Sequence, residues 1–163
     1  MYRIEGCKDL QSIESKEKVY VRFKNCTDRM VELLWIDFTG CFKRYHLLRK
    51  DQFVDINTFK THPWMAVDVH TKDRLHIAKR FRYMPTPCAQ IFLRMYPVVP
   101  VKRRVVVAIT LPVHSLRYQA LLTVKNYFRN PNDVDVLDIP QNVRDDLKKL
   151  IIIRNKFVLI PSF

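Results

Sequence analysis

Glycine is scarce in this chain of 163 residues, which contains only Gly6 and Gly40. Loops that hold nucleotide phosphates need several glycines at fixed spacing. A glycine-rich nucleotide-binding loop is therefore excluded. The chain also has no apolar run close to the roughly 20 residues that span a bilayer. Its first residues alternate charged and bulky side chains, whereas a signal peptide has an apolar run there. We expect neither a membrane span nor a signal peptide.

Cysteine is infrequent, and no two cysteines form a C-x-x-C pair. The four positions are Cys7, Cys26, Cys41 and Cys88. We predict free thiols in a reducing, intracellular setting. A hydrolase that uses Cys41 or Cys88 with a histidine is one alternative, but no residue beside either cysteine would activate it. His70 and His76 lack a second ligand pair for zinc, so we expect no metal and no cofactor.

Acidic residues are outnumbered, since the chain has 16 of them and 29 lysines and arginines, which gives a net charge of +13. Such an excess favours polyanionic partners. The basic residues are dispersed, however, and the densest groups are Lys79–Arg80–Arg82 and Lys102–Arg103–Arg104. A basic, β-rich domain that binds nucleic acid or another polyanion is the alternative function that the charge suggests. The hydrophobic fraction of 48% indicates a folded protein.

The first two thirds of the chain show the alternation of apolar and polar residues that is typical of β-strands. In Lys18–Asn25, for example, Val19, Val21 and Phe23 share one face. Short strands with no helical pattern between them predict an antiparallel β-sandwich domain over residues 1–112, which begins with a loosely held leader at 1–16. The predicted strands are Lys18–Asn25, Val31–Phe38, Phe42–Leu48, Phe53–Phe59, Trp64–Val69, Leu75–Ile77, Ile91–Tyr96 and Arg104–Leu111.

The periodicity changes to that of helices after Pro112. Ser115 can cap a first helix, and Asn130–Pro131 can end it. A second helix is expected near Pro140, because proline is favoured in the first turn. The chain is therefore predicted to be mainly β, with a small helical domain at residues 113–156. The apolar tail at residues 157–163 is expected to pack on the β domain.

Candidate binding residues concentrate in Ile56–Trp64, which reads I-N-T-F-K-T-H-P-W. This span brings a hydroxyl (Thr58), an imidazole (His62) and an indole (Trp64) close together in the sequence. Apolar walls with a few polar groups are typical of a small recognition pocket. Histidine and tryptophan at a strand end also occur as ordinary core residues, and the span alone does not separate these two interpretations.

Four segments in this order resemble the von Hippel–Lindau (VHL) family, whose members are substrate receptors of cullin-type ubiquitin ligases. They are L-L-W-I-D-F-T-G at Leu33–Gly40, Tyr45, the span Ile56–Trp64, and I-T-L-P-V-H-S-L at Ile109–Leu116. The resemblance extends from about Val19 to about Leu150. It implies a non-catalytic protein of cytoplasm and nucleus that directs its target to ubiquitination and proteasomal degradation.

The resemblance also implies a ligand, namely the prolyl-hydroxylated alpha subunit of the hypoxia-inducible factor. The residues that would bind it are Trp35, Tyr45, Asn57, Thr58, His62 and Trp64. Two of them differ from the family, which has serine at the position of Thr58 and histidine at that of Asn57. A site that pairs with the proline hydroxyl would reject the unmodified residue, because its buried polar groups would stay unpaired.

The helical region resembles two partner-binding boxes of the same family. Ser115, Leu116, Ala120 and Val124 match the Elongin C box, and Ile139, Pro140, Val143 and Leu147 match the neighbouring cullin box. Ala120 replaces the usual cysteine, and a smaller side chain would underfill the partner's pocket. The implied partners are Elongin C with Elongin B, a cullin scaffold and a RING subunit.

Overall fold

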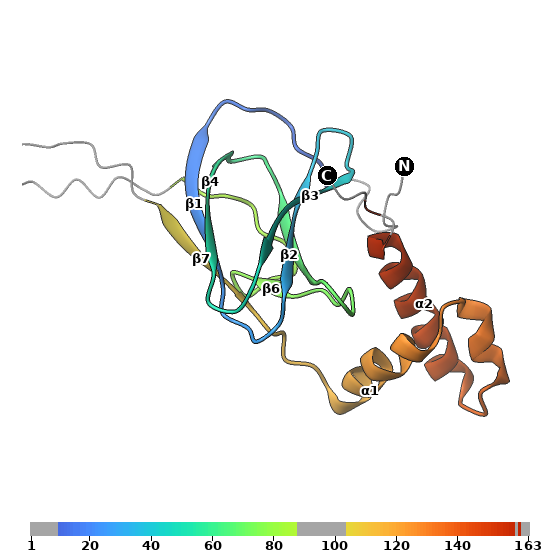
Figure 1. Ribbon diagram of the computed structural model, residues 1–163. Coiled ribbons are helices and arrows are strands. Elements are labelled where there is room, and N and C mark those ends of the chain that lie inside the picture. The colour runs from blue at the N-terminus through green and yellow to red at the C-terminus, as the bar shows by residue number, and fades with distance from the viewer. Residues whose placement is uncertain (1–9, 88–103, 159, 161–163) are drawn as a thin grey trace, which may run out of the picture.

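The computed structural model describes residues 10–87, 104–158 and 160, and it shows two packed β-sheets followed by a small helical region (Figure 1). The strands are β1 (Lys18–Asn25), β2 (Val31–Ile36), β3 (Phe42–Leu48), β4 (Phe53–Phe59), β5 (Trp64–Asp68), β6 (His76–Ile77) and β7 (Val105–Thr110). The helical segments are α1 (Leu116–Val124), η1 (Lys125–Tyr127), η2 (Pro131–Val136) and α2 (Gln141–Val158). The predicted strand Ile91–Tyr96 lies outside the described residues.

The sandwich is confirmed, with one departure from the antiparallel prediction. One sheet has the strand order β4-β1-β7-β6 and the other has the order β3-β2-β5. The departure is that β1 and β7 pair in parallel, with Val21 opposite Val105. All the other paired strands are antiparallel. Apolar side chains from both sheets, among them Phe23, Leu33 and Trp64, fill the space between them.

Four strands are shorter than the sequence predicted, and aspartates end two of them early. β6 begins at His76 instead of Leu75, and β7 spans Val105–Thr110 instead of Arg104–Leu111. β2 stops at Ile36, since Asp37 Oδ1 accepts hydrogen bonds from the backbone N–H groups of Thr39 and Cys41. β5 stops at Asp68, whose Oδ1 accepts from the N–H groups of His70 and Thr71. Such aspartate turns take up backbone donors that would otherwise extend the strand.

Glu32 on β2 is a fully buried carboxylate. It forms an ion pair with Arg44 of β3 and a second one with Lys72, whose Nζ lies 2.8 Å from Oε2. Buried charges persist in folded proteins only when they are paired in this way. The interruption of an otherwise apolar strand by Glu32 therefore has a structural reason, because two cations from neighbouring segments neutralise it.

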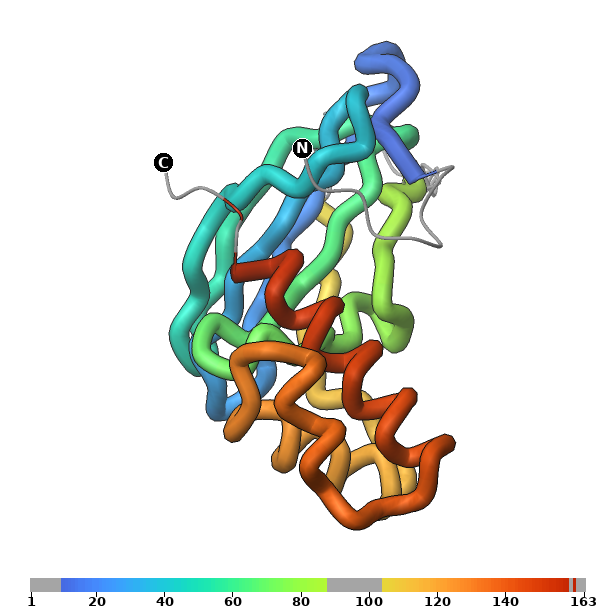
Figure 2. The backbone as a smooth tube through the Cα atoms, turned by 90° about the vertical axis from the view of Figure 1, so that its right-hand side faces the viewer, coloured from blue at the N-terminus to red at the C-terminus, as the bar shows by residue number. Residues whose placement is uncertain are grey.

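The helical region has a core of its own and is also fixed to the sandwich. Leu121, Val134, Leu147 and Ile151 are buried together. At its far end α2 carries Phe157, which packs with Ile160 against Leu34, Ile36, Met65 and Val67 on the outer face of the β3-β2-β5 sheet. Figure 2 shows α2 running back from the other helical segments toward the strands. The helix thus extends to Val158, two residues beyond the end that the sequence suggested for the helical domain.

Candidate functional site

The hydroxyl, one indole and the phenol of the predicted pocket lie together in the sandwich. Thr58 on β4 and Trp64 on β5 are both buried, and the Trp64 Nε1–H donates to Thr58 Oγ1 over 3.1 Å. The ring of Tyr45 on β3 meets the Trp64 ring nearly at a right angle, with 4.9 Å between centroids. Tyr45 is 50% exposed, so this group opens to solvent on the side of the phenol.

The imidazole and the second indole form an adjoining group. His62 follows β4, and its ring lies 5.3 Å from that of Trp35 on β2. Trp35 is paired with Trp64 across β2 and β5, which places the two groups side by side. The exposed ring of Phe38 stands edge-on to both Trp35 and His62, at 5.9 and 5.4 Å. The structure therefore gathers Trp35, Tyr45, Thr58, His62 and Trp64 at one place.

The N-terminal segment supplies contacts to this place that the sequence did not predict. The Trp35 Nε1–H donates to Ser12 Oγ over 2.9 Å, and Ser15 Oγ lies 3.2 Å from His62 Nε2. Thr61 Oγ1 in turn donates to the Glu14 carbonyl. Residues 10–16 are therefore anchored rather than loosely held, and residues 1–9 lie outside the described part. No periodicity in the sequence signals these two serines, because isolated polar residues in an irregular segment follow no pattern.

The protonation states of the group suit the recognition of a hydroxyl. Burial lowers the pKa of His62 from its ordinary 6.5, so the ring is neutral at pH 7 and keeps one nitrogen as an acceptor. Thr58 accepts from Trp64 and still has its own hydroxyl proton to donate. Thr58 thus offers a donor beside the aromatic walls, and His62 offers an acceptor at Nδ1 in the tautomer whose Nε2–H donates to Ser15.

Asn57 is not part of this group. Side chains alternate along a strand, so Asn57 faces away from Thr58, and it lies exposed on the outer face of the β4-β1-β7-β6 sheet. There its Oδ1 accepts from Arg104 Nη2 over 3.2 Å. The structure separates Asn57 from the other five predicted pocket residues, and any contact that it makes to a peptide would be on the outer surface.

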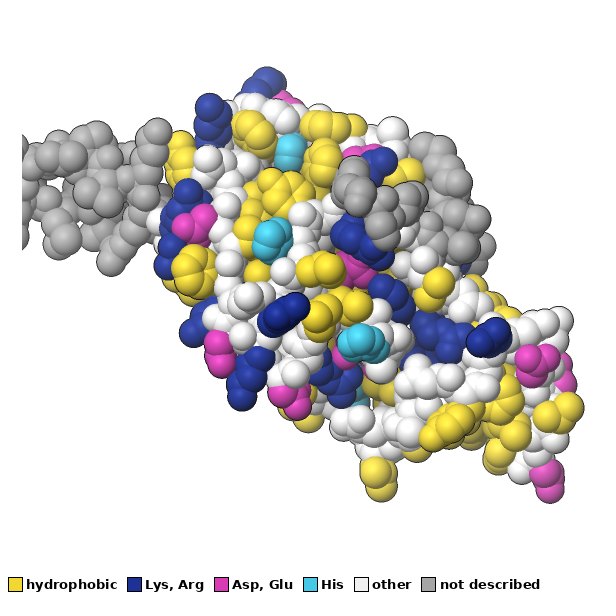
Figure 3. Space-filling view, viewed as in Figure 1, with side chains coloured by type: hydrophobic (Ala, Val, Ile, Leu, Met, Phe, Trp, Pro, Cys, Tyr) yellow, Lys and Arg dark blue, Asp and Glu magenta, His cyan; other side chains and the backbone are white. Residues whose placement is uncertain are grey.

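The face of the molecule shown in Figure 3 carries hydrophobic and histidine side chains over the sandwich, bordered by basic ones.

Most of the first predicted partner box is on the surface. Ser115 caps α1 by accepting from the Tyr118 N–H, while Leu116 and Ala120 are exposed and Val124 is half-buried. Leu116 is 86% exposed, and Val113 just before the helix is 96% exposed. Large apolar side chains that project this far commonly mark contact surfaces for other proteins. The helix buries Leu121 instead, on the side that faces α2 and η2.

The second predicted box is divided between surface and interior. Pro140 is exposed just before α2, and Ile139 and Val143 are half-buried. Leu147 is 1% exposed and belongs to the core of the helical region. A partner can therefore contact Pro140 directly, whereas Leu147 holds the helices together beneath that surface.

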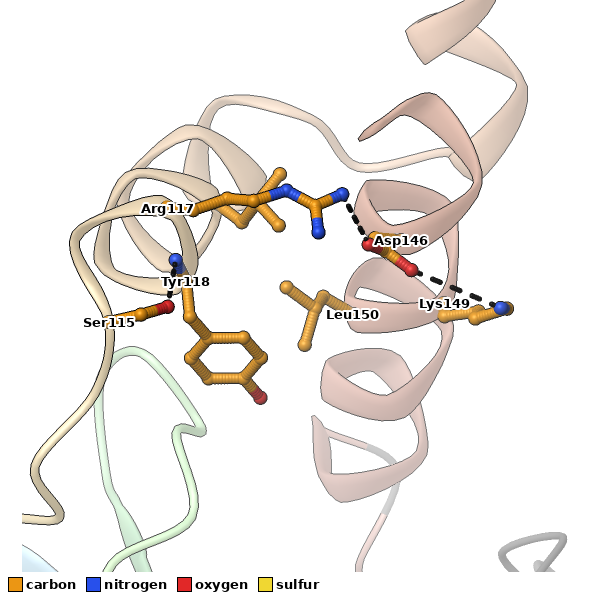
Figure 4. A pocket seen from close by; sticks show the side chains of 7 residues that line it. Ser115, Arg117, Tyr118, Asp146, Lys149 and Leu150 are labelled. Carbon is orange, nitrogen blue, oxygen red and sulfur yellow. Dashed lines mark hydrogen bonds and ion pairs between the residues drawn. The ribbon is translucent and has the colours of Figure 1, made fainter. Parts of the chain in front are cut away.

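A cavity of about 260 Å³ lies between α1 and α2. Figure 4 shows Tyr118 from α1 and Leu150 from α2 pointing into the space between the helices, with Arg117 joined to Asp146 across it. The Arg117 Nη2 to Asp146 Oδ2 distance is 2.7 Å. The cavity adjoins Ser115, so it belongs to the surface on which the first box is displayed.

Lys125 is a buried cation at the junction between the sandwich and the helices. Its Nζ pairs with Asp73 and donates to the Thr71 carbonyl over 3.2 Å. Burial lowers the pKa of Lys125, and Asp73 opposes that shift. Arg154 of α2 donates to the carbonyls of Lys125 and Phe128, so the same point also fixes α2.

Within residues 10–87 and 104–158, no three histidine, cysteine or acidic side chains come together in a way that would hold a metal ion. No described helix combines the length and the apolar character that crossing a bilayer demands.

Comparisons with known proteins identify the source of the resemblance. Residues 10–90 match the family model described as the VHL beta domain. Over 143 residues the chain is 27% identical to Protein Vhl of Drosophila melanogaster, an alignment that covers 85% of this chain and 80% of that protein. The family model spans β1 to β6 and so contains all five residues of the candidate pocket.

Proposed function

Since this chain belongs to the von Hippel–Lindau family through its β-sandwich, we propose that it is the substrate-recognition subunit of a cullin-RING ubiquitin ligase. Its ligand is a prolyl-hydroxylated segment of the alpha subunit of the hypoxia-inducible factor, which it directs to ubiquitination and proteasomal degradation in the cytoplasm and nucleus. The chain itself carries out no catalysis. The observation that carries the proposal is the grouping of Trp35, Tyr45, Thr58, His62 and Trp64.

Recognition depends on the match between this group and a hydroxylated pyrrolidine ring. The aromatic side chains provide flat apolar surfaces for the ring. Thr58 donates to the hydroxyl oxygen, and the neutral ring of His62 accepts the hydroxyl proton. Unmodified proline would leave the Thr58 hydroxyl proton and the second ring nitrogen of His62 buried without a partner, and this penalty is the origin of selectivity.

The rest of the peptide has a strand edge beside the pocket. Within the described residues β4 pairs only with β1, so the other edge of β4 keeps backbone groups available. A peptide that adds to such an edge gains main-chain hydrogen bonds while its side chains enter pockets. Thr58 lies on β4 itself, so a peptide in this position brings its hydroxylated proline to the group.

The helical region joins this receptor to the ligase. We assign Elongin C, together with Elongin B, to the exposed side of α1 with Ser115, Leu116, Ala120 and Val124. The cullin and its RING subunit are assigned to the surface at Ile139, Pro140 and Val143. The exposure of Val113 and Leu116 supports this assignment, since the described chain leaves these apolar side chains uncovered.

The assignment to Elongin C is tested by co-purification with the Elongin B–Elongin C pair. Leu116→Asp is expected to abolish the complex, because it places a charge in an apolar contact. Ala120→Cys is expected to strengthen it by restoring the filled volume. Lys50→Asp, an exposed change in the turn between β3 and β4, serves as the control. Unchanged complex formation in Leu116→Asp would contradict the assignment.

A further inference from the structure

Most of the net positive charge of this chain lies in one continuous part of the sequence, because acidic residues are absent there. No aspartate or glutamate occurs between Asp73 and Asp133, a stretch that contains eleven lysines and arginines. The acidic residues lie on either side of this stretch. The pocket and the helical partner surface leave this segregation unexplained, because neither depends on basic side chains.

Near the start of this stretch is a tight hairpin, which we call the basic hairpin (residues 77–84). Ile77 and Arg80 exchange both backbone hydrogen bonds, at 2.7 and 3.2 Å. Ala78 and Lys79 between them have φ values of 53° and 63°, which is the geometry of a two-residue type I′ turn. The turn fixes the backbone of the hairpin, so its cations are presented in a defined arrangement.

Three cations of the basic hairpin are available to a partner. Lys79, Arg80 and Arg82 are exposed, and none of their side chains has a hydrogen bond or ion pair within the described residues. Elsewhere many exposed basic side chains are paired, as Arg22 is with Asp55. The basic hairpin therefore offers unneutralised positive charge on a rigid support.

The contacts of the Phe81 ring indicate which class of anionic partner the basic hairpin can bind. Phe81 lies between Arg80 and Arg82, and its ring is contacted by Arg74 at 4.9 Å and by His76 at 4.7 Å. His114 lies parallel to it at 6.4 Å. A base-stacking surface needs open aromatic faces. Phe81 is 36% exposed but already has these three side chains against its ring, and this disfavours a nucleic acid.

The backbone after Phe81 favours an extended peptide. Tyr83 uses both its N–H and its carbonyl to pair with Trp64, so residues 82–84 lie along the free edge of β5. Along such an edge the neighbouring residues, Arg82 and Met84, turn their backbone groups outward. Neither forms a backbone hydrogen bond within the described residues. A second chain can add to this edge by main-chain pairing.

We propose that the basic hairpin is a docking site for an extended acidic segment of a partner protein, which lies next to the hydroxyproline pocket and uses different side chains. The acidic side chains pair with Lys79, Arg80 and Arg82, while the backbone adds to the edge at residues 82–84. This site gives the excess of positive charge a specific role.

The test uses the full chain and three labelled probes of equal length, followed by fluorescence anisotropy. The probes are a peptide of alternating aspartate and valine, its asparagine counterpart, and a single-stranded oligonucleotide. The variant Arg80→Glu/Arg82→Glu is compared with Arg49→Glu/Lys50→Glu, which changes the net charge equally at the exposed turn between β3 and β4. Thermal unfolding verifies that both variants are folded.

The acidic peptide is expected to bind the wild type more tightly than the other two probes do. Binding should weaken roughly tenfold or more in Arg80→Glu/Arg82→Glu, because like charges repel, and it should change little in the control. Equal losses in both variants would show that net charge alone attracts the peptide, and would overturn the proposal. Tighter binding of the oligonucleotide, or no binding of the acidic peptide by the wild type, would overturn it as well.

Discussion

The hydrogen bond between Trp64 and Thr58 links the stability of the pocket to its selectivity. Thr58→Val keeps the shape of the side chain but removes the acceptor of the Trp64 Nε1–H. We expect the free energy of unfolding to fall by about 1–2 kcal/mol, since a buried donor loses its partner. Preference for a hydroxylated peptide should disappear in the same variant. Urea unfolding and peptide titration measure the two effects.

Thr58→Ser is the matched control, because it removes only a methyl group and keeps the hydroxyl. It should preserve the preference for the hydroxylated peptide and lose little stability. If Thr58→Ser lost the preference as fully as Thr58→Val, packing rather than the hydroxyl would determine selectivity.

His62 makes the stability of the chain depend on pH in a defined direction. Burial lowers the folded-state pKa below the ordinary 6.5, so the unfolded chain takes up a proton more readily than the folded one. The contribution of His62 to the free energy of unfolding is therefore unaffected above pH 6.5. It becomes increasingly unfavourable as the pH falls below that value. The unfolding free energy of the wild type should decline more steeply there than that of His62→Gln. Parallel pH profiles would contradict this account.

At the scale of single residues, the sequence predicted the chemistry of the site better than its extent. Trp35, Tyr45, Thr58, His62 and Trp64 could be named because their types and spacing match a family pattern. Ser12 and Ser15 could not, since they reach the site from an irregular segment through contacts that are distant in the sequence.

At the scale of elements, α2 depends on its last turn for attachment to the sandwich. Phe157 is fully buried against the β3-β2-β5 sheet, where its ring meets Phe42 at 5.4 Å. Phe157→Ala should lower the free energy of unfolding by about 3–5 kcal/mol. The neighbouring Val158 is 56% exposed, so Val158→Ala should change stability by less than about 0.5 kcal/mol. Equal small effects in urea unfolding would contradict this packing.

The strands could be predicted closely because alternating burial is a local property of the sequence. β1, β3 and β4 have the predicted bounds. Pairing partners are not local, and the parallel neighbours β1 and β7 are separated by most of the sandwich sequence. The first helical segments are only partly buried, since Leu116 and Tyr127 are exposed while Leu121 packs inward.

At the scale of the whole molecule, Lys125 holds the helical region against the sandwich. Removing the buried charge leaves Asp73 with only the longer ion pair to Arg29, at 3.9 Å, so Lys125→Ala should lower the free energy of unfolding by about 3 kcal/mol. Lys148→Ala breaks the more exposed pair with Asp135 and should change it by less than about 1 kcal/mol. Chemical unfolding compares the two variants. Similar values for both would show that the junction does not depend on Lys125.

The central claim is that the chain recognises a proline by its hydroxyl group. Its most direct test is a pair of calorimetric titrations with one peptide from the degradation segment of the hypoxia-inducible factor, carrying either proline or 4-hydroxyproline. We predict that the hydroxylated peptide binds roughly a thousandfold more tightly, because only it satisfies Thr58 and His62. Equal affinity for the two peptides would contradict the assignment of the pocket.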